Sequence, residues 1–275
     1  MLARTLKRIT RRAAFEARSF PVRVKEMLLA AVPEEFKYTR GVISMQASLD
    51  NLRRNGFYPA AIIDVGAFQG DWSRMVRRIY PNTPIHMLEA NPEKEPLLGA
   101  AVREIGAAEY HIALLGPEPA ASVLYYVRET GSSVLPENTS LPGSTRQLPM
   151  NTLDRVLEQG KQLPGPYLLK LDVQGFELEI LRGAEHILEN SEAVLLEVAL
   201  IAYNQGAPLF AEVVAFMRAQ GFVVYDISGF YRRESDAALY MVDLLFTRES
   251  SALRSPKRFW NLEAKFESAP PLSSK

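Results

Sequence analysis

The stretch AIIDVGAFQG, residues 61–70, joins an apolar run to Asp64 and then to two glycines, Gly66 and Gly70. An apolar run that stops at a glycine turn predicts a buried strand followed by a tight connection. In open sheets covered by helices, ligands bind outside the carboxyl ends of such strands. This turn is therefore the first place at which to look for both the fold and a ligand.

Strands and helices alternate along the rest of the chain. We predict strands over residues 61–66, 84–90, 108–116, 122–127, 165–175, 193–201, 222–233 and 238–250, and helices over residues 44–57, 71–80, 91–106, 152–160, 176–190 and 210–221. Residues 128–146 are rich in Gly, Pro, Ser and Thr and predict a loop, with the strand before them in a short antiparallel insertion. This order predicts an α/β fold with a mostly parallel sheet between helices. The last two strands are joined by too short a segment for a crossover, so they run antiparallel.

The composition sets limits on the class of protein. The chain has 275 residues, of which 47% are hydrophobic and 23% charged, and its formal net charge is zero, so no nucleic acid partner is indicated. It contains no cysteine, which excludes disulfides, thiolate metal ligands and a cysteine nucleophile. The only histidines are His86, His111 and His186, which disfavours a histidine-rich metal site, and each is interpreted as a packed or surface residue. No apolar run approaches the roughly 18 residues of a membrane span, and we expect a cytoplasmic protein.

The charge is uneven at the N-terminus. Residues 1–25 carry many Arg and Lys residues against Glu16 alone, and apolar residues recur there at helical spacing. A solvated or packed helix, peripheral attachment to an anionic membrane, and an organelle transit peptide all remain open. We divide the chain into a basic helical extension (1–43), a main domain (44–250) and a loosely ordered tail (251–275).

The glycine spacing bears on the ligand. A dinucleotide fingerprint has three glycines as G-x-G-x-x-G, whereas here Gly66 and Gly70 are spaced G-x-x-x-G. Asp64 is a poor neighbour for a phosphate and a good one for an ammonium group, and Glu89 ends the next strand, where it can accept hydrogen bonds from ribose hydroxyls. Together they favour S-adenosylmethionine. The plainer interpretations are a helix-capping acid for Asp64 and an exposed strand-end acid for Glu89.

Several blocks of the sequence resemble one family. The stretches SLDNLRRNGFYPAAIIDVGAFQGDW, MLEANPE, GSSVL, NTLDRVL, LLKLDVQGFELEILRGAE and LLEV, within residues 44–248, are similar to the FkbM-type family of S-adenosylmethionine-dependent methyltransferases. The resemblance implies a class I methyltransferase (Rossmann-like) sheet of seven strands with an antiparallel last strand. It implies cofactor positions at Asp64, Gly66, Gly70 and Glu89, and the same two turns add Ala67, Phe68, Ala90 and Asn91. Gln174 stands where many relatives have glutamate, which leaves a third carboxylate role there open.

A second group of charged residues follows in YLLKLDVQG. Lys170 and Asp172 point to the same side of their strand, and Glu197 ends the next one. A charged pair inside a covered sheet is unfavourable without partners, so we interpret these three residues as catalytic. Asp172 and Glu197 could act as base and orienting group, or could hold a divalent cation. A structural Lys170–Asp172 pair is the plainer alternative.

The acceptor is expected to lie against the loops at the same end of the sheet. These loops offer polar groups that are equally well explained as solvated loop residues: Ser132, Ser133, Tyr203, Asn204, Arg232 and Arg233. We predict O-methylation of a hydroxyl on a small molecule or a glycan. The alternatives are an NAD-dependent oxidoreductase and a non-catalytic nucleotide-binding module.

Overall fold

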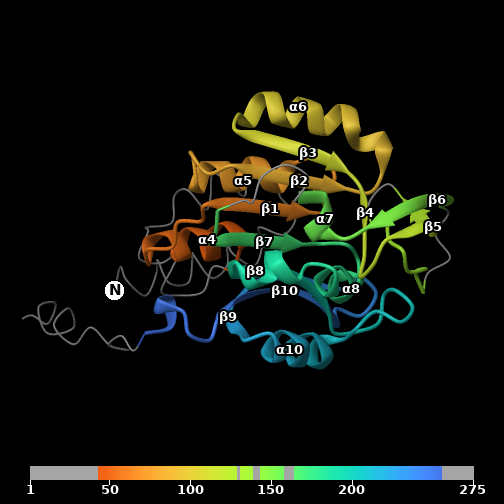
Figure 1. Cartoon of the computed structure of the whole chain (residues 1–275). Coiled ribbons are helices and arrows are strands. Elements are labelled where there is room, and N and C mark those ends of the chain that lie inside the picture. The colour runs from red at the N-terminus through yellow and green to blue at the C-terminus, as the bar shows by residue number, and fades with distance from the viewer. Residues whose placement is uncertain (1–42, 129–130, 139–142, 158–163, 256–275) are drawn as a thin grey trace, which may run out of the picture.

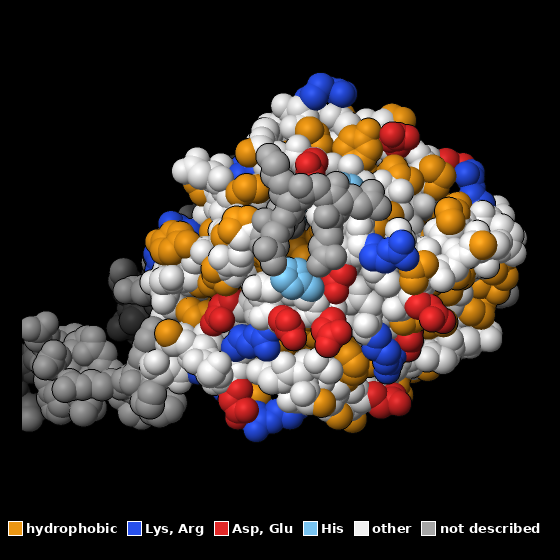
Figure 2. All heavy atoms as spheres, viewed as in Figure 1, with side chains coloured by type: hydrophobic (Ala, Val, Ile, Leu, Met, Phe, Trp, Pro, Cys, Tyr) orange, Lys and Arg blue, Asp and Glu red, His pale blue; other side chains and the backbone are white. Residues whose placement is uncertain are grey.

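The computed structural model describes residues 43–128, 131–138, 143–157 and 164–255 (Figure 1). The predicted basic helix and most of the predicted tail lie outside these residues. Within them, no helix is both long enough and apolar enough to cross a membrane. On the face drawn in Figure 2, basic side chains are scattered among acidic ones and form no continuous basic patch.

A seven-stranded sheet forms the centre of the molecule, in the order β3-β2-β1-β7-β8-β10-β9. The strands are β1 (Ala61–Val65), β2 (Ile85–Glu89), β3 (Ala108–Ile112), β7 (Tyr167–Leu171), β8 (Ser191–Ala199), β9 (Phe222–Arg232) and β10 (Leu239–Arg248). Only β10 runs antiparallel to its neighbours β8 and β9. The predicted class I methyltransferase sheet with an antiparallel last strand is confirmed.

Helices cover both faces of this sheet (Figure 1). One face carries α4 (Met45–Arg54), α5 (Asp71–Ile79) and α6 (Glu95–Ile105), which pack through Leu49, Val76 and Leu98. The other face carries α7 (Leu153–Leu157), α8 (Glu177–Arg182), α9 (Glu185–Glu189) and α10 (Phe210–Ala219). Because both faces are covered, β1, β2 and β7 are buried at every position, which explains their near-continuous apolar sequences.

A small second sheet lies beyond the main one, in the order β4-β6-β5. It consists of β4 (Leu114–Leu115), β5 (Ala120–Val127) and β6 (Ser144–Asn151), and β5 pairs antiparallel with β6, which confirms the predicted antiparallel insertion. The prediction of a loop up to residue 146 is wrong at its end, because β6 already begins at Ser144. The sequence STRQLPMN lacks a regular apolar alternation, so its strand depends on pairing with β5.

The predicted single helix over residues 176–190 is wrong, because the structure divides it into α8 and α9. The division occurs at Gly183, where a Cβ atom would lie 2.2 Å from the carbonyl oxygen of Gly116. The backbone therefore packs directly against the segment after β4, and a continuous helix does not fit there.

The turn after β1 depends on a similar close approach. Gly66 has φ of 74°, and a Cβ on it would lie 2.0 Å from the carbonyl oxygen of Asp172. The end of β1 and the end of β7 thus touch through their backbones. Gly56 also has a positive φ, 95°, but among the described residues no atom beyond its own chain neighbours lies within 4 Å of its Cβ position.

These two glycines give a matched test of the close approach. A left-handed conformation costs a side chain about 1–2 kcal/mol, so Gly56→Ala should lower the free energy of unfolding by about that amount. Gly66→Ala should cost clearly more, because it adds a clash between main-chain and side-chain atoms. Urea unfolding measures both, and equal losses for the two variants would contradict the contact between Gly66 and Asp172.

Candidate functional site

A cavity of about 280 Å³ opens where β1, β2 and β7 end. It brings together the glycine turn, the turn after β2 and the end of β7, although these segments are far apart in the sequence. The predicted site residues that line it are Gly66, Phe68, Glu89, Ala90, Asn91, Ser132, Ser133, Asp172 and Glu197, joined by Gln174, Lys94 and Tyr125. Ala67 and Gly70 lie in the same turn as Gly66 but do not line it.

Glu89 is held in a fixed orientation at the cavity wall. Its Oε2 accepts a hydrogen bond from the backbone N–H of Phe68 at 2.8 Å, and its Oε1 accepts one from the N–H of Asn91 at 2.8 Å. Burial raises the pKa of the Glu89 carboxyl, and these two hydrogen bonds oppose that rise. Each carboxylate oxygen can accept a further bond, so Glu89 can receive two hydroxyl donors from a ligand.

Asp64 lies differently from what the sequence led us to expect. It is fully buried and does not line the cavity. Its Oδ2 accepts a hydrogen bond from the hydroxyl of Ser73 at 2.7 Å, and its Oδ1 lies 3.1 Å from Nζ of Lys170. Direct contact with a ligand ammonium group is therefore not open to Asp64, and its observed contacts are structural.

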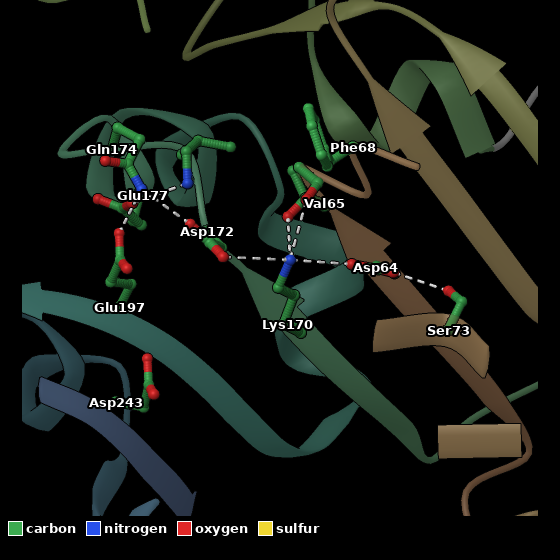
Figure 3. A network of polar contacts seen from close by, with 12 residues as sticks. Asp64, Val65, Phe68, Ser73, Lys170, Asp172, Gln174, Glu177, Glu197 and Asp243 are labelled. Carbon is green, nitrogen blue, oxygen red and sulfur yellow. Dashed lines mark hydrogen bonds and ion pairs between the residues drawn. The ribbon is translucent and has the colours of Figure 1, made fainter. Parts of the chain in front are cut away.

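Lys170 connects the two predicted groups of charged residues (Figure 3). Its ammonium donates to the carbonyl oxygen of Gly66 at 3.0 Å and lies 3.7 Å from Oδ2 of Asp172, farther than from Asp64. Burial by itself lowers the pKa of Lys170, but the carboxylates of Asp64 and Asp172 outweigh it and hold that pKa above its ordinary value. The main partner of Lys170 is thus Asp64, and Asp172 keeps one oxygen for other contacts.

Gln174 joins the two carboxylates that line the cavity. Its amide nitrogen donates to Oδ1 of Asp172 at 3.1 Å and to Oε2 of Glu197 at 2.6 Å (Figure 3). The amide is oriented with nitrogen toward these atoms because both partners are acceptors. Gln174 adopts φ of 60°, a left-handed backbone conformation that residues other than glycine rarely adopt. The available sequence signal for this role was a polar residue just before Gly175, where the strand was predicted to end; the structure ends β7 at Leu171.

Two further buried acids lie near this pair: Asp243, which was not singled out from the sequence, and Glu177, which the sequence placed at the start of a helix. Asp243 is paired with Glu197 in the β8–β10 register and accepts a hydrogen bond from the hydroxyl of Tyr231 at 2.8 Å. Burial raises the pKa of Asp243 to about 6 and that of Glu177 to about 7. Burial and the neighbouring Asp172 raise the pKa of Glu197 well above its ordinary value.

The loop residues predicted to contact an acceptor mainly hold the loops together. The hydroxyl of Ser132 donates to the carbonyl of Arg128, and that of Ser133 donates to the carbonyl of Gln174 at 3.1 Å. Asn204 donates to the same Gln174 carbonyl. Tyr203 and Asn204 do not line the cavity, Arg232 lines a separate groove beside β9, and Arg233 pairs with Asp236 on the surface.

The buried ion pair makes a strong prediction about stability. Lys170→Met leaves Asp64 buried without its cation and should lower the free energy of unfolding by about 3–5 kcal/mol. Adding Asp64→Leu removes the unpaired charge and should recover most of that loss, because two apolar residues of similar size can replace a buried pair. Urea unfolding of both single variants and the double variant measures this coupling, and additive losses would contradict it.

The raised carboxyl pKa values predict how stability depends on pH. Glu177 stays protonated in the folded protein up to about pH 7, whereas in the unfolded chain it ionises near pH 4.3. Because the folded state holds the extra proton, this group lowers the stability progressively as the pH rises from about 4.3 to 7. The thermal midpoint should therefore fall less between pH 5 and 8 in Glu177→Gln, whose side-chain oxygen can keep the bonds from Val173 and Gly175. Identical slopes in the wild type and the variant would contradict a raised pKa.

Solved structures with a related arrangement share little sequence with this chain. The methyltransferase FkbM of Methylobacillus flagellatus KT is 12% identical over 67% of this chain and 43% of its own, with a TM-score of 0.43. The magnesium protoporphyrin IX methyltransferase of Synechocystis PCC 6803, solved with bound SAM, is 12% identical over 74% of this chain and 79% of its own, with a TM-score of 0.41. The TrmK of M. capricolum, solved with S-adenosyl-homocysteine, is 9% identical over 78% of this chain and 73% of its own, with a TM-score of 0.43.

The chain thus spans less than half of the Methylobacillus protein. No curated protein matches it. The family model of the methyltransferase FkbM domain matches residues 64–224, which is more than half of the chain and contains the glycine turn, Glu89, Lys170, Asp172 and Glu197. The chain therefore belongs to the FkbM methyltransferase family.

Proposed function

We propose that the protein transfers a methyl group from S-adenosylmethionine to a hydroxyl oxygen of a small molecule or a glycan. The observation that carries this proposal is that Glu89 and the Asp172–Gln174–Glu197 group line one cavity. A ligand held at Glu89 would then lie beside two carboxylates that can accept a proton. A methyltransferase acting on oxygen needs both features within one site.

The charge around the cavity supports S-adenosylmethionine over a dinucleotide. Among the described residues, three acids line it, Glu89, Asp172 and Glu197, and one basic side chain, that of Lys94. Acidic walls favour the sulfonium and ammonium groups of S-adenosylmethionine and oppose a pyrophosphate. Glu89, with both oxygens fixed by backbone N–H groups, is placed to accept hydrogen bonds from the two ribose hydroxyls. In the part of the chain that the structure describes, Lys94 is the one basic side chain at the cavity that could meet the phosphates of NAD.

In the proposed reaction the acceptor oxygen attacks the methyl carbon bonded to the sulfonium sulfur. The new O–CH₃ bond forms as the S–CH₃ bond breaks. The electron pair of the S–CH₃ bond stays on sulfur, so the sulfonium becomes the neutral thioether of S-adenosylhomocysteine. The hydroxyl proton passes to a carboxylate, for which Asp172 is placed at the cavity wall with its side chain 36% exposed. Such base assistance is typically worth about 10²–10⁴-fold in rate. Gln174 and Glu197 would orient Asp172.

The same pair of carboxylates does not fit a divalent cation as it stands. The amide nitrogen of Gln174 already lies between Asp172 and Glu197, at 3.1 and 2.6 Å from their oxygens. The hydrogens on this neutral amide nitrogen carry partial positive charge and repel a cation, so a metal ion bridging these two acids would have to displace the nitrogen. The proposed reaction accordingly uses the carboxylates for proton transfer.

Cofactor binding tests the first half of the proposal. Calorimetry should show binding of S-adenosylhomocysteine and no binding of NAD. Glu89→Ala should weaken that binding by roughly 1.5–3 kcal/mol, because hydrogen bonds to a charged acceptor are lost. Glu104→Ala, which removes an exposed acid paired with Arg74, is the control and should bind normally. NAD binding without S-adenosylhomocysteine binding would reverse the assignment.

Methyl transfer tests the second half. The protein is incubated with methyl-labelled S-adenosylmethionine and with extracts of small molecules and of glycans, and labelled products are identified by mass spectrometry as methyl ethers. Asp172→Asn should slow transfer by about 10²–10⁴-fold while S-adenosylhomocysteine affinity and the thermal midpoint stay unchanged. Asp71→Asn, an exposed acid at the start of α5, is the control and should transfer normally. An Asp172→Asn protein that unfolds early but transfers at the normal rate would show a structural role for Asp172.

A further inference from the structure

Two histidines and a glutamate lie together on β2 and β3, outside the cavity. In the parallel register of these strands His86 is opposite Glu109. His111 follows Glu109 by two positions, so it projects from the same face of β3. Three groups that can bind a metal therefore converge on one face at the edge of the sheet.

Their atoms are already close to a metal-binding arrangement. Nδ1 of His86 lies 2.7 Å from Oε1 of Glu109, and Nε2 of His111 lies 3.2 Å from the same oxygen. All three donor atoms lie within 4.8 Å of one another. Tetrahedral zinc, with bonds of about 2.0–2.2 Å, places its ligand atoms roughly 3.3 Å apart. Small side-chain movements would therefore complete such a site.

The burial of His86 also fits a ligand role. The residue is only 7% exposed, and its Nε2 is buried with no hydrogen-bond partner among the described residues. Its polar contact is made through Nδ1, the nitrogen that faces Glu109. Nδ1 is therefore the nitrogen of His86 that is available to an ion held by this group.

We propose that His86, Glu109 and His111 bind a divalent transition-metal ion of the zinc class, with solvent as the remaining ligand. Two imidazoles and one carboxylate are a donor set that such ions accept, whereas Mg²⁺ prefers oxygen ligands. Glu109 and His111, whose side chains are 58% and 30% exposed, give the ion a route from solvent. The ion would join the edge strand β3 to β2.

The affinity of this site has a physical limit. When the metal takes Nδ1 of His86, the ring proton moves to Nε2, where no acceptor is placed among the described residues. Zinc sites usually satisfy this second nitrogen, and its loss typically weakens binding by about 10–100-fold. We therefore expect weaker binding than at a zinc site with a complete outer shell.

The composition makes a clear experiment possible. The chain has no cysteine and only three histidines, and the third, His186 on α9, lies apart from this group. The full chain, free of any histidine tag and treated with EDTA, is titrated with zinc chloride in a calorimeter. The expected result is one site that His111→Ala abolishes and that Glu109→Gln weakens at least tenfold, with His186→Ala as the unchanged control.

A second measurement guards against a folding defect in the variants. Zinc should raise the thermal midpoint of the wild type in a concentration-dependent way, because an ion that binds only the folded state stabilises it, and EDTA should reverse the rise. His111→Ala should have a normal midpoint without zinc and should show no rise with it. Two results would overturn the proposal: no heat of binding up to about millimolar zinc, or binding that both variants leave unchanged. Either result would mean that the three side chains form a hydrogen-bonded cluster and no metal site. Neither outcome depends on the proposed methyl transfer.

Discussion

The buried ammonium group of Lys170 is the interaction on which the geometry of the cavity depends. Lys170 is 4% exposed, so its charge must be satisfied by protein groups instead of water. Asp64 on β1, the carbonyl of Gly66 and Asp172 after β7 supply those groups (Figure 3). Lys170 consequently links the glycine turn to the end of β7, and the missing Cβ of Gly66 allows the two backbones to approach closely at the same point.

Beside Lys170 and Asp64, three further acids lie near one another at this end of the sheet. Asp172, Glu197 and Asp243 follow one another across β7, β8 and β10, and burial raises the pKa of Glu197 and Asp243. Such a row opposes folding when the acids are ionised. In the proposed complex a positively charged methyl donor would compensate it, so the same acids that weaken the free protein would favour the cofactor.

Features of the fold and the site that depend on a local sequence pattern could be predicted from the sequence. The apolar run before Asp64, the glycine spacing and the acid at the end of β2 led to the fold and to one wall of the cavity. Contacts that depend on how neighbouring strands pair, residue against residue, could not be predicted from such patterns. Asp243 lies opposite Glu197 only through antiparallel pairing, and His86 lies opposite Glu109 only through the β2–β3 register. The contact between Asp64 and Lys170 was missed for the same reason, because Lys170 is distant from Asp64 in the sequence and adjacent to it in the sheet.

Gln174 shows how one amide sets the kind of chemistry available to two acids. Asp172 and Glu197 lie close enough that both bond one nitrogen, at 3.1 and 2.6 Å, and like charges at that spacing repel. An amide nitrogen offers them two N–H donors and no charge, so the pair is held together without a cation. A glutamate at this position would remove both donors and add a third acceptor, and a divalent cation would then be the natural way to neutralise the group. With glutamine, the two acids are held together without a cation, and in the proposed reaction Asp172 would take the proton of the hydroxyl.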